Sequence, residues 1–273
     1  MSEPAKSLNV GVAGFGTIGA VVSHRLDQGV FGLRLVAIAA RNIDKARLQV
    51  EQFSNPVPIL DHSMLADMAD VIVDCTPASV SREIAEQVLQ AGRILVPLSI
   101  GVLLEHPELI DLAVQRGGRI IVPTGALLGL DAVRAAAEGR IHAVRIVTRK
   151  PPRGLEGAPY LVEKGIDITD LKEPIQVFSG NARDGIIGFP GNVNVAVALS
   201  LAGVGADRTE LEIWIDPRLE RNVHTVVVEA DSARFTMNIE NIPSVENPST
   251  GRITALSVIA ALRGLVSPMR AGS

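Results

Sequence analysis

The sequence has little of what several classes of protein require. Its 273 residues include one cysteine, Cys75, so no disulfide can form within the chain. Aromatic residues make up only 3%, which leaves few rings for stacking on nucleic-acid bases. Lys and Arg total 26 against 30 Asp and Glu, so the chain lacks the basic excess that nucleic acid and anionic membranes attract. We therefore expect neither nucleic acid nor a membrane as a partner.

Long hydrophobic runs are also missing. No uninterrupted apolar segment reaches the roughly 20 residues of a membrane-spanning helix. The N-terminal segment MSEPAKSLN is polar and lacks the charged and then apolar pattern of a secretory signal. These features predict a soluble, cytoplasmic protein. Hydrophobic residues nevertheless make up 47% of the chain, and they are mainly aliphatic, which suits helices packed on sheets.

The first part of the chain alternates short apolar segments with helical patterns. Nearly continuous apolar strands separated by helices are typical of βαβ units around a parallel sheet. The predicted strands are 8–14, 33–40, 70–76, 93–99 and 119–125, with helices at 17–28, 43–52, 78–91 and 104–116. This pattern predicts a dinucleotide-binding Rossmann domain, a doubly wound parallel sheet, over residues 1–126.

The pattern changes after this domain. Apolar and polar residues alternate along several segments, which predicts a half-exposed antiparallel sheet. The predicted strands are 143–150, 210–216, 222–230 and 234–242, with helices at 128–139 and 192–203. We therefore predict an α/β chain with an α+β catalytic and substrate domain over 127–247. A last helix over 248–273, with Asn247 as N-cap and Pro248 in its first turn, can return to the Rossmann domain.

A glycine motif, GFGTIG, lies directly between the first predicted strand and the first predicted helix. In this position Gly14 permits a tight turn, Gly16 lets the backbone approach a pyrophosphate, and Gly19 lets the helix pack close to the sheet. The helix that begins near Thr17 and Ile18 offers N–H groups to phosphates. We expect these five residues to bind a dinucleotide; the alternative is a glycine-rich turn without a ligand.

The end of the second predicted strand bears on the choice of cofactor. NAD enzymes commonly place an acidic residue there to hold the ribose hydroxyls. This chain has Arg41 and Asn42 instead, which can pair with a 2′-phosphate and hydrogen-bond a ribose. We expect NADP to be accepted as well as NAD; alternatively, Arg41 is only solvated. Thr76 and Pro77, at the end of the third strand, lie where such sheets bind ligands and are further cofactor candidates.

Histidine is the side chain best suited to proton transfer at neutral pH. Among the five histidines, His224 stands out because it lies in an alternating strand with Asn222 on the same face. We expect His224 to be catalytic; a structural histidine is the alternative. Cys75 lies in an apolar strand with no basic residue nearby in sequence, which favours a core residue over a reactive thiol.

Four further segments are distinctive. They are PTGALLGLDAV (123–133), GFPGNVNVAVALSLAG (188–203), DPRLERNVHTVVVEA (216–230) and ENIPSVENPSTGRITALS (240–257). In this order they resemble the L-aspartate dehydrogenase family over essentially the whole chain. The resemblance implies NAD(P)-dependent, reversible oxidative deamination of L-aspartate to oxaloacetate and ammonia through iminoaspartate. It also implies a Rossmann domain, an α+β catalytic domain and a homodimer.

The resemblance also assigns residues. His224 takes the place of the family's active-site histidine, Ala126 that of a backbone contact to the cofactor, and Asn194 that of a cofactor-binding asparagine, with Asn192 as the alternative. The family often has Asn-Pro-Lys-Thr where this chain has Asn-Pro-Ser249-Thr, a departure that removes a positive charge and bears on substrate choice.

The two carboxylates of the substrate require cationic or N–H partners. Candidates in the second domain are Lys150 and Arg221, with Arg149 and Lys164 less favoured, and the Thr250 hydroxyl can partly replace the missing lysine. We assign no metal ligands. Two alternatives stay open: a reductase of another small dicarboxylate or imine, of the dihydrodipicolinate or homoserine type, and a non-catalytic NADP(H)-sensing protein.

Overall fold

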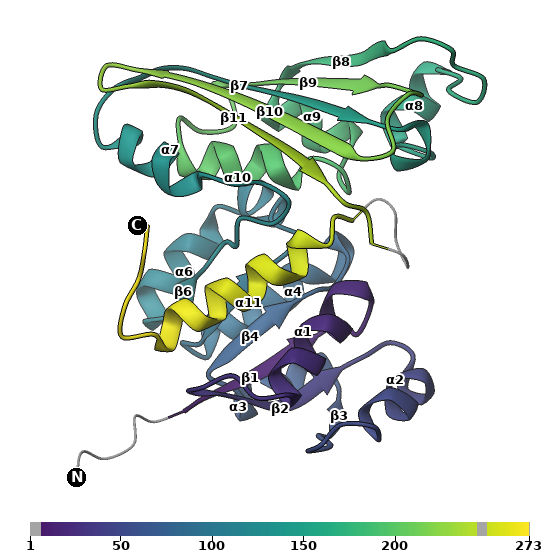
Figure 1. Cartoon of the computed structure of the whole chain (residues 1–273). Helices are drawn as coiled ribbons and strands as arrows, with labels where there is room; N and C mark the ends of the chain where they lie inside the picture. Colours follow the sequence, from purple (N-terminus) through teal and green to yellow (C-terminus); the bar gives the residue numbers. More distant parts are fainter. Residues whose placement is uncertain (1–6, 245–249, 273) are drawn as a thin grey trace. The chain divides into compact units, whose positions relative to one another are not determined.

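The structure, a computed structural model, describes residues 7–244 and 250–272. They form two compact units. The first unit contains the described residues up to Pro123 together with Ala255–Arg270. The second unit contains the described residues of Thr124–Thr254 and the end of the chain from Ala271. Each unit is built around one sheet (Figure 1).

The first unit contains a six-stranded sheet in the order β3-β2-β1-β4-β5-β6, and every neighbouring pair is parallel. This order is characteristic of dinucleotide-binding folds, whose ligands lie at the carboxyl ends of the strands. The strands are β1 (Leu8–Ala13), β2 (Leu33–Ala39), β3 (Ile59–Leu60), β4 (Val71–Asp74), β5 (Ile94–Pro97) and β6 (Arg119–Ile120). The predicted parallel sheet is therefore confirmed.

Helices cover both faces of this sheet, as its continuous apolar strands require. One core cluster packs α1 and α11 against β1 and β2, and a second packs α3, α4 and α6 against the other face. Figure 1 shows α11, in yellow, lying along the sheet of this unit. The helices are α1 (Thr17–Asp27), α2 (Ile43–Val50), η1 (His62–Met64), α3 (Leu65–Met68), α4 (Ala78–Gln90), α5 (Val102–Glu105), α6 (Glu108–Arg116) and α11 (Ile253–Val266).

The prediction of one helix over 104–116 is wrong, because the chain breaks between α5 and α6. Pro107 follows His106, whose backbone has φ −130° and ψ 67°. A residue before proline is disfavoured in the helical region, since the proline ring collides with its backbone. Two shorter helices result.

The second unit contains a five-stranded sheet in the order β11-β10-β7-β9-β8. The prediction of an antiparallel sheet is wrong for one pair, because β7 and β9 run parallel while the other neighbours run antiparallel. The long crossover from β7 to β9 contains β8, three α-helices and one short 3-10 helix, and only such a crossover can join parallel strands. The strands are β7 (Ile141–Lys150), β8 (Ile175–Asn181), β9 (Thr209–Ile215), β10 (Asn222–Ala230) and β11 (Arg234–Asn241).

Helices lie on one face of this sheet, as Figure 1 shows for α7, α9 and α10. The residues of β7 that point toward the core, from Val144 through Ile146 and Thr148 to Lys150, are buried, whereas those between them are half-buried or exposed. The helices of this unit are α7 (Leu130–Ala137), η2 (Pro152–Gly154), α8 (Pro159–Lys164), α9 (Ala182–Gly188) and α10 (Asn194–Ala202).

The last helix begins later than the sequence predicted. Residues 250–252 pair with residues 242–244 through the hydrogen bonds Ser244 N to Thr250 O, 2.8 Å, and Arg252 N to Ile242 O, 2.9 Å. Asn247 and Pro248, the predicted cap and first turn, lie outside the described residues.

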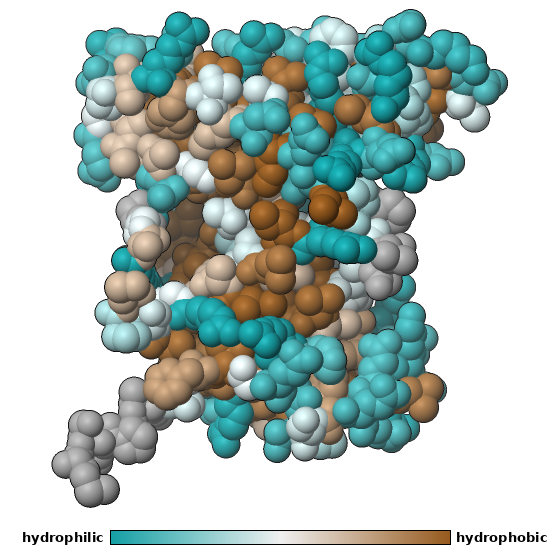
Figure 2. All heavy atoms as spheres, viewed as in Figure 1, coloured by the Kyte–Doolittle hydropathy of each residue, from teal (hydrophilic) through white to brown (hydrophobic). Residues whose placement is uncertain are grey.

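Hydrophobic residues gather on the surface over α11 (Figure 2), where Leu256 is 58% exposed. Within the described part of the chain, no helix is long and apolar enough to cross a membrane.

Candidate functional site

The glycine loop of the first unit has the geometry that pyrophosphate binding requires. Gly14 has φ 88°, and a Cβ there would lie 2.8 Å from the Cys75 carbonyl oxygen. A Cβ on Gly19 would collide with the carbonyl oxygen of Gly14. By contrast, a Cβ on Gly16 would meet no atom within 4 Å. Gly14 and Gly19 are therefore required by packing, whereas Gly16 borders open space.

The start of α1 adds unpaired N–H groups to this open space. Gly16 is the N-cap, it provides no side-chain capping bond, and the first turn contains no acidic residue. The backbone N–H groups of a helix start and its dipole favour an anion. The space beside Gly16 and the N–H groups that follow, at Thr17 and Ile18, therefore fit the pyrophosphate of a dinucleotide.

The residues after β2 occupy the position where the adenosine ribose is recognised in this fold. Arg41 and Asn42 are both exposed there. The Asn42 Oδ1 atom accepts a hydrogen bond from Lys45 N, 3.0 Å, and so caps α2. The helix cap thus uses the amide oxygen of Asn42, so a hydrogen bond donated to a ribose would have to come from its NH2 group.

A buried carboxylate that the sequence analysis overlooked fixes Thr76, the residue before Pro77. Asp74 ends β4 and is fully buried, and its Oδ1 accepts from Thr76 N, 2.9 Å, and from Thr76 Oγ1. Its Oδ2 accepts from Ser81 Oγ in α4. Burial raises the pKa of the Asp74 carboxyl, and the hydrogen bonds from Ser81 and Thr76 oppose this rise. An acidic residue inside an apolar strand was the signal for this role.

Burial also raises the pKa of the thiol of Cys75, which follows Asp74 in the chain. This thiol is therefore poorly suited to act as a nucleophile.

The second unit gathers Thr148, Lys150, Asn222 and His224 on the helix-covered face of two neighbouring strands; we call these four residues the β7–β10 cluster. His224 pairs with Thr148 across the strands and is 3% exposed. Thr148 Oγ1 lies 3.0 Å from His224 Nδ1. Burial and, to a lesser extent, the positive charge of Lys150 lower the pKa of His224 to about 3. His224 is therefore a neutral imidazole that Thr148 holds in a fixed orientation.

Lys150 lies two residues beyond Thr148 on β7 and is also 3% exposed. Its Nζ donates to Asn192 Oδ1 at 2.7 Å, and its distance to the Asn192 carbonyl oxygen is 3.4 Å. Burial lowers the pKa of Lys150 to about 8. Asn192 was predicted to contact the cofactor, and it thus contacts Lys150, which was predicted to bind the substrate.

Two asparagines complete the polar face. Asn222 pairs with Asn241 of β11, and both are buried. Within the described residues, Asn222 Oδ1 and Asn241 Oδ1 have no hydrogen-bond partner. Asn241 Nδ2 donates to the carbonyl oxygen of Ala126, 2.9 Å, which fixes that predicted cofactor residue. The sequence analysis overlooked Thr148 and Asn241, although the alternation of their strands places both on the inward face.

Other predicted substrate residues lie apart from this cluster. The side chain of Arg221 is 52% exposed and lies 3.9 Å from a carboxylate oxygen of Glu240. Arg149 points to the opposite face of β7, where its guanidinium carbon lies 4.7 Å from the centre of the Trp214 ring. Lys164 is exposed beside Glu163. Asn194 begins α10, and Thr250 is half-buried, whereas Ser249 lies outside the described residues.

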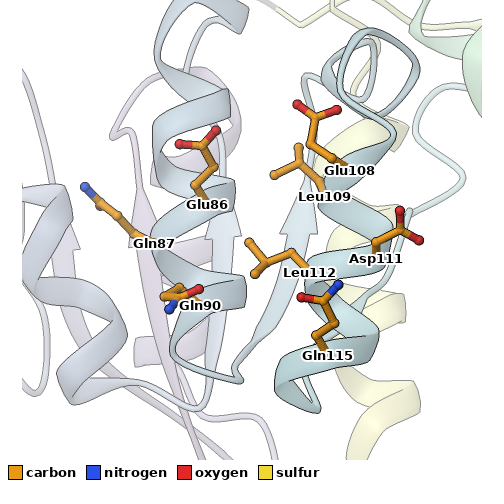
Figure 3. Close-up of a pocket in the computed structure, with 8 residues that line it drawn as sticks. All are labelled: Glu86, Gln87, Gln90, Glu108, Leu109, Asp111, Leu112 and Gln115. Atoms are coloured by element: carbon orange, nitrogen blue, oxygen red, sulfur yellow. The ribbon is translucent and has the colours of Figure 1, made fainter.

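A groove of about 630 Å³ lies elsewhere, between α4 and α6 of the first unit (Figure 3). Its lining is mainly acidic and amide side chains, with two leucines at its floor. The lining residues are Glu86, Gln87, Gln90, Glu108, Leu109, Asp111, Leu112 and Gln115. None is a predicted site residue, and the three carboxylates would repel a phosphate. The groove is therefore not the cofactor site.

Comparisons with known proteins agree along the whole chain. A family model described as "Aspartate dehydrogenase, C-terminal" matches residues 131–265, and one described as "Homoserine dehydrogenase, NAD binding domain" matches residues 14–123. An L-aspartate dehydrogenase of Bradyrhizobium diazoefficiens is 54% identical over 95% of this chain and 92% of its own length. L-Aspartate dehydrogenase 3 of Bordetella bronchiseptica is 51% identical over 98% of each.

A solved structure has the same fold. The crystal structure of an aspartate dehydrogenase from Thermotoga maritima superimposes with a TM-score of 0.75 at 24% identity, covering 97% of this chain and 99% of that one. The fold class predicted from the sequence is thereby confirmed.

The glycine loop gives a prediction with an internal control. Gly16→Ala should leave thermal stability nearly unchanged, because the added methyl group meets no protein atom. It should weaken NADPH and NADH binding by about tenfold or more, because the methyl group occupies the space proposed for phosphate. Gly19→Ala should lower the melting temperature, since its Cβ collides with Gly14. Calorimetry and cofactor titration measure both effects, and unchanged cofactor affinity in Gly16→Ala would contradict the assignment.

Proposed function

This chain belongs to the aspartate dehydrogenase family, and we propose that it catalyses the reversible oxidative deamination of L-aspartate to oxaloacetate and ammonia through iminoaspartate. The observation that carries the proposal is the β7–β10 cluster, in which a buried histidine and a buried lysine face one polar surface. A non-catalytic nucleotide sensor would have no need for two costly buried groups of this kind.

NAD or NADP is the cofactor of this family of amino-acid dehydrogenases, and when bound it supplies or accepts the hydride. We assign the phosphates to Gly14, Gly16, Thr17, Ile18 and Gly19. The further cofactor residues that we propose are Arg41, Asn42, Thr76, Pro77, Ala126, Asn192 and Asn194. The first unit thus supplies the phosphate-binding loop, and the second unit supplies the remaining three cofactor residues and performs the proton transfers.

His224 is the proposed acid–base residue. In the deaminating direction its neutral ring accepts the proton that water releases as it adds to the imine carbon of iminoaspartate. In the aminating direction the protonated ring returns that proton to the hydroxyl that leaves as water. Thr148 positions the ring through the contact with Nδ1, so that Nε2 is the atom that exchanges the proton.

The reaction has a direct assay. With oxaloacetate, ammonia and either NADPH or NADH, the wild-type protein should oxidise the cofactor, which absorbance at 340 nm follows. His224→Ala should lower kcat by about 10²–10⁴-fold, the usual contribution of a general acid–base residue, with cofactor affinity nearly unchanged. Near-normal turnover would rule out His224.

A matched variant separates chemistry from orientation. Thr148→Val keeps the shape of the side chain and removes the hydroxyl that contacts Nδ1. It should lower kcat by less than His224→Ala does, with little change in KM.

If wild-type protein binds NADPH but oxidises none at high enzyme concentration, the substrate assignment fails and another small dicarboxylate or imine must be tested.

Arg41 supports the use of NADP. A guanidinium pairs strongly with phosphate, so Arg41→Ala should raise KM for NADPH by about tenfold and leave KM for NADH within about twofold. Arg47→Ala is the control, because Arg47 lies on the neighbouring helix α2 and pairs with Asp44 at 3.7 Å. Equal effects of Arg41→Ala on both cofactors would show that Arg41 does not contact a 2′-phosphate.

We also propose a homodimer formed through the face of the second sheet that its helices leave open. This face contains Val147 and the only tryptophan, Trp214, both half-buried in the single chain. The Trp214 ring contacts Arg149 and donates to Glu212, 3.0 Å, and aromatic and arginine side chains are enriched at the centres of interfaces.

Sedimentation equilibrium tests the dimer. Wild-type protein should have twice the 28.9 kDa mass of one chain. Val147→Glu places a charge in the proposed interface and should produce monomers, with a shift of Trp214 fluorescence to longer wavelength. Val162→Glu, on the exposed surface of α8, should stay dimeric. A wild-type mass of one chain at micromolar concentration would refute the dimer.

A further inference from the structure

Within the described part of the chain, Lys150 is a buried cation without a buried anion. Its ammonium donates to the neutral oxygen of Asn192, and no ion pair to it occurs among the described residues. Asp216 reaches Lys150 only through its backbone, with Asp216 N donating to the Lys150 carbonyl oxygen, while its carboxylate accepts from Arg218. An unpaired buried charge destabilises a protein, so such a group is expected where a ligand of opposite charge binds.

Lys150 and His224 influence each other. Thr148 and Lys150 point to the same face of β7, and Thr148 contacts the His224 ring, so the ammonium and the imidazole face one polar surface. Each of the two groups is driven toward its neutral form by burial, and the charge of Lys150 further opposes protonation of His224. The state in which Lys150 and His224 are both protonated is therefore the least favourable state of the pair.

We propose that Lys150, held by Asn192, receives a carboxylate of the dicarboxylate substrate and, until that carboxylate arrives, adds to the burial that keeps His224 unprotonated. This proposal rests on the proposed function. It identifies Lys150 as the group that would select a substrate with a second carboxylate. Toward substrate Lys150 is a binding residue; toward the proton transfer it is a positioning residue that acts through His224.

The arrival of the carboxylate changes both groups in a defined direction. A negative charge beside Lys150 raises the lysine pKa and cancels its field at His224, so the pKa of His224 rises as well. The histidine then accepts a proton more readily when substrate is present than when the site is empty. His224 is thus better suited to proton transfer in the substrate complex than in the empty site.

The first test uses succinate, a dicarboxylate without an amino group, and the cofactor-loaded protein. Because the pKa of Lys150 is lowered to about 8, the ammonium is charged below that pH and loses its charge above it. The Kd for succinate should be constant up to neutral pH and rise by up to about tenfold per pH unit above pH 8. Propionate, with one carboxylate, should bind more weakly at every pH.

Two variants assign this pH dependence to Lys150. Lys150→Met has a similar volume and replaces the charge with an apolar group, a change that buried sites often tolerate. It should weaken succinate binding by on the order of 30-fold or more at neutral pH and remove the pH dependence. Lys150→Arg keeps a positive charge at all these pH values, so succinate binding should survive without the loss above pH 8.

The second test follows His224 itself by NMR of histidine-labelled protein, with the resonance assigned through His224→Gln. In free wild-type protein the ring should stay neutral from about pH 8 down to about pH 4, as its pKa of about 3 requires. Protonation should begin at higher pH in Lys150→Met and in wild-type protein saturated with succinate. A purely structural role of Lys150 would not move this titration.

The outcomes separate this proposal from the proposed function. Two results would overturn the coupling and leave aspartate dehydrogenase activity standing. One is succinate binding that does not depend on pH in wild-type protein. The other is a His224 titration that is the same in free wild-type protein, in Lys150→Met and in wild-type protein saturated with succinate. Absence of that activity, with the pH-dependent succinate binding present, would instead overturn the substrate assignment. The wild-type measurements decide the proposal even if Lys150→Met does not fold.

Discussion

The pairing of β10 with β7 is the constraint on which the chemistry of the second unit depends. The register that places Val223 opposite Arg149 also places His224 opposite Thr148, and it turns Lys150 toward the same face. A shift of β10 by one residue would move His224 to the other face of the sheet, away from Thr148 and Lys150. The buried aliphatic residues of β10, Val226 and Val228, oppose such a shift, because they would then be exposed. Ordinary hydrophobic packing therefore fixes the positions of the polar groups.

The second unit tolerates these polar groups at a cost in stability. A neutral histidine can be buried with a single hydroxyl partner, whereas a buried ammonium requires more than one neutral acceptor to replace its lost hydration. Asn192 supplies a short hydrogen bond to Lys150, but Asn222 Oδ1 and Asn241 Oδ1 lack partners within the described residues. Such incompletely satisfied groups are typical of sites that bind a polar ligand, since the ligand completes the hydrogen bonds.

The sequence predicts the first unit well because its signals are local. Glycine spacing, continuous apolar strands and helix periodicity each depend on neighbouring residues, and β1, β2 and α1 lie close to the predicted ranges. The exceptions also have local causes: Pro107 divides one helix, and β3 is only two residues long. The second unit is harder to predict because β8, α8 and α9 fall in a segment rich in glycine and proline. The parallel pairing of β7 with β9 depends on that segment.

Site residues follow the same division. His224 could be chosen from its strand pattern and from the family resemblance, because both signals lie in its own segment. The role of Thr148 and the contact of Asn192 with Lys150 could not be predicted, since they depend on residues 76 and 42 positions apart in the sequence. Asp74 lies between these cases: a buried acid in an apolar strand is visible in the sequence, but its partner Ser81 becomes clear only once α4 is placed.

The return of α11 to the first unit has a consequence for how the protein is made. Val258 and Leu262 of this helix are fully buried in the core beneath β1 and β2, and Gly32 approaches Val266 so closely that a Cβ would lie 2.9 Å from it. The ribosome releases this helix after every strand of the second unit. The nucleotide-binding unit therefore cannot close its core until the strands of the second unit have been synthesised, although all six of its own strands precede that unit in the chain.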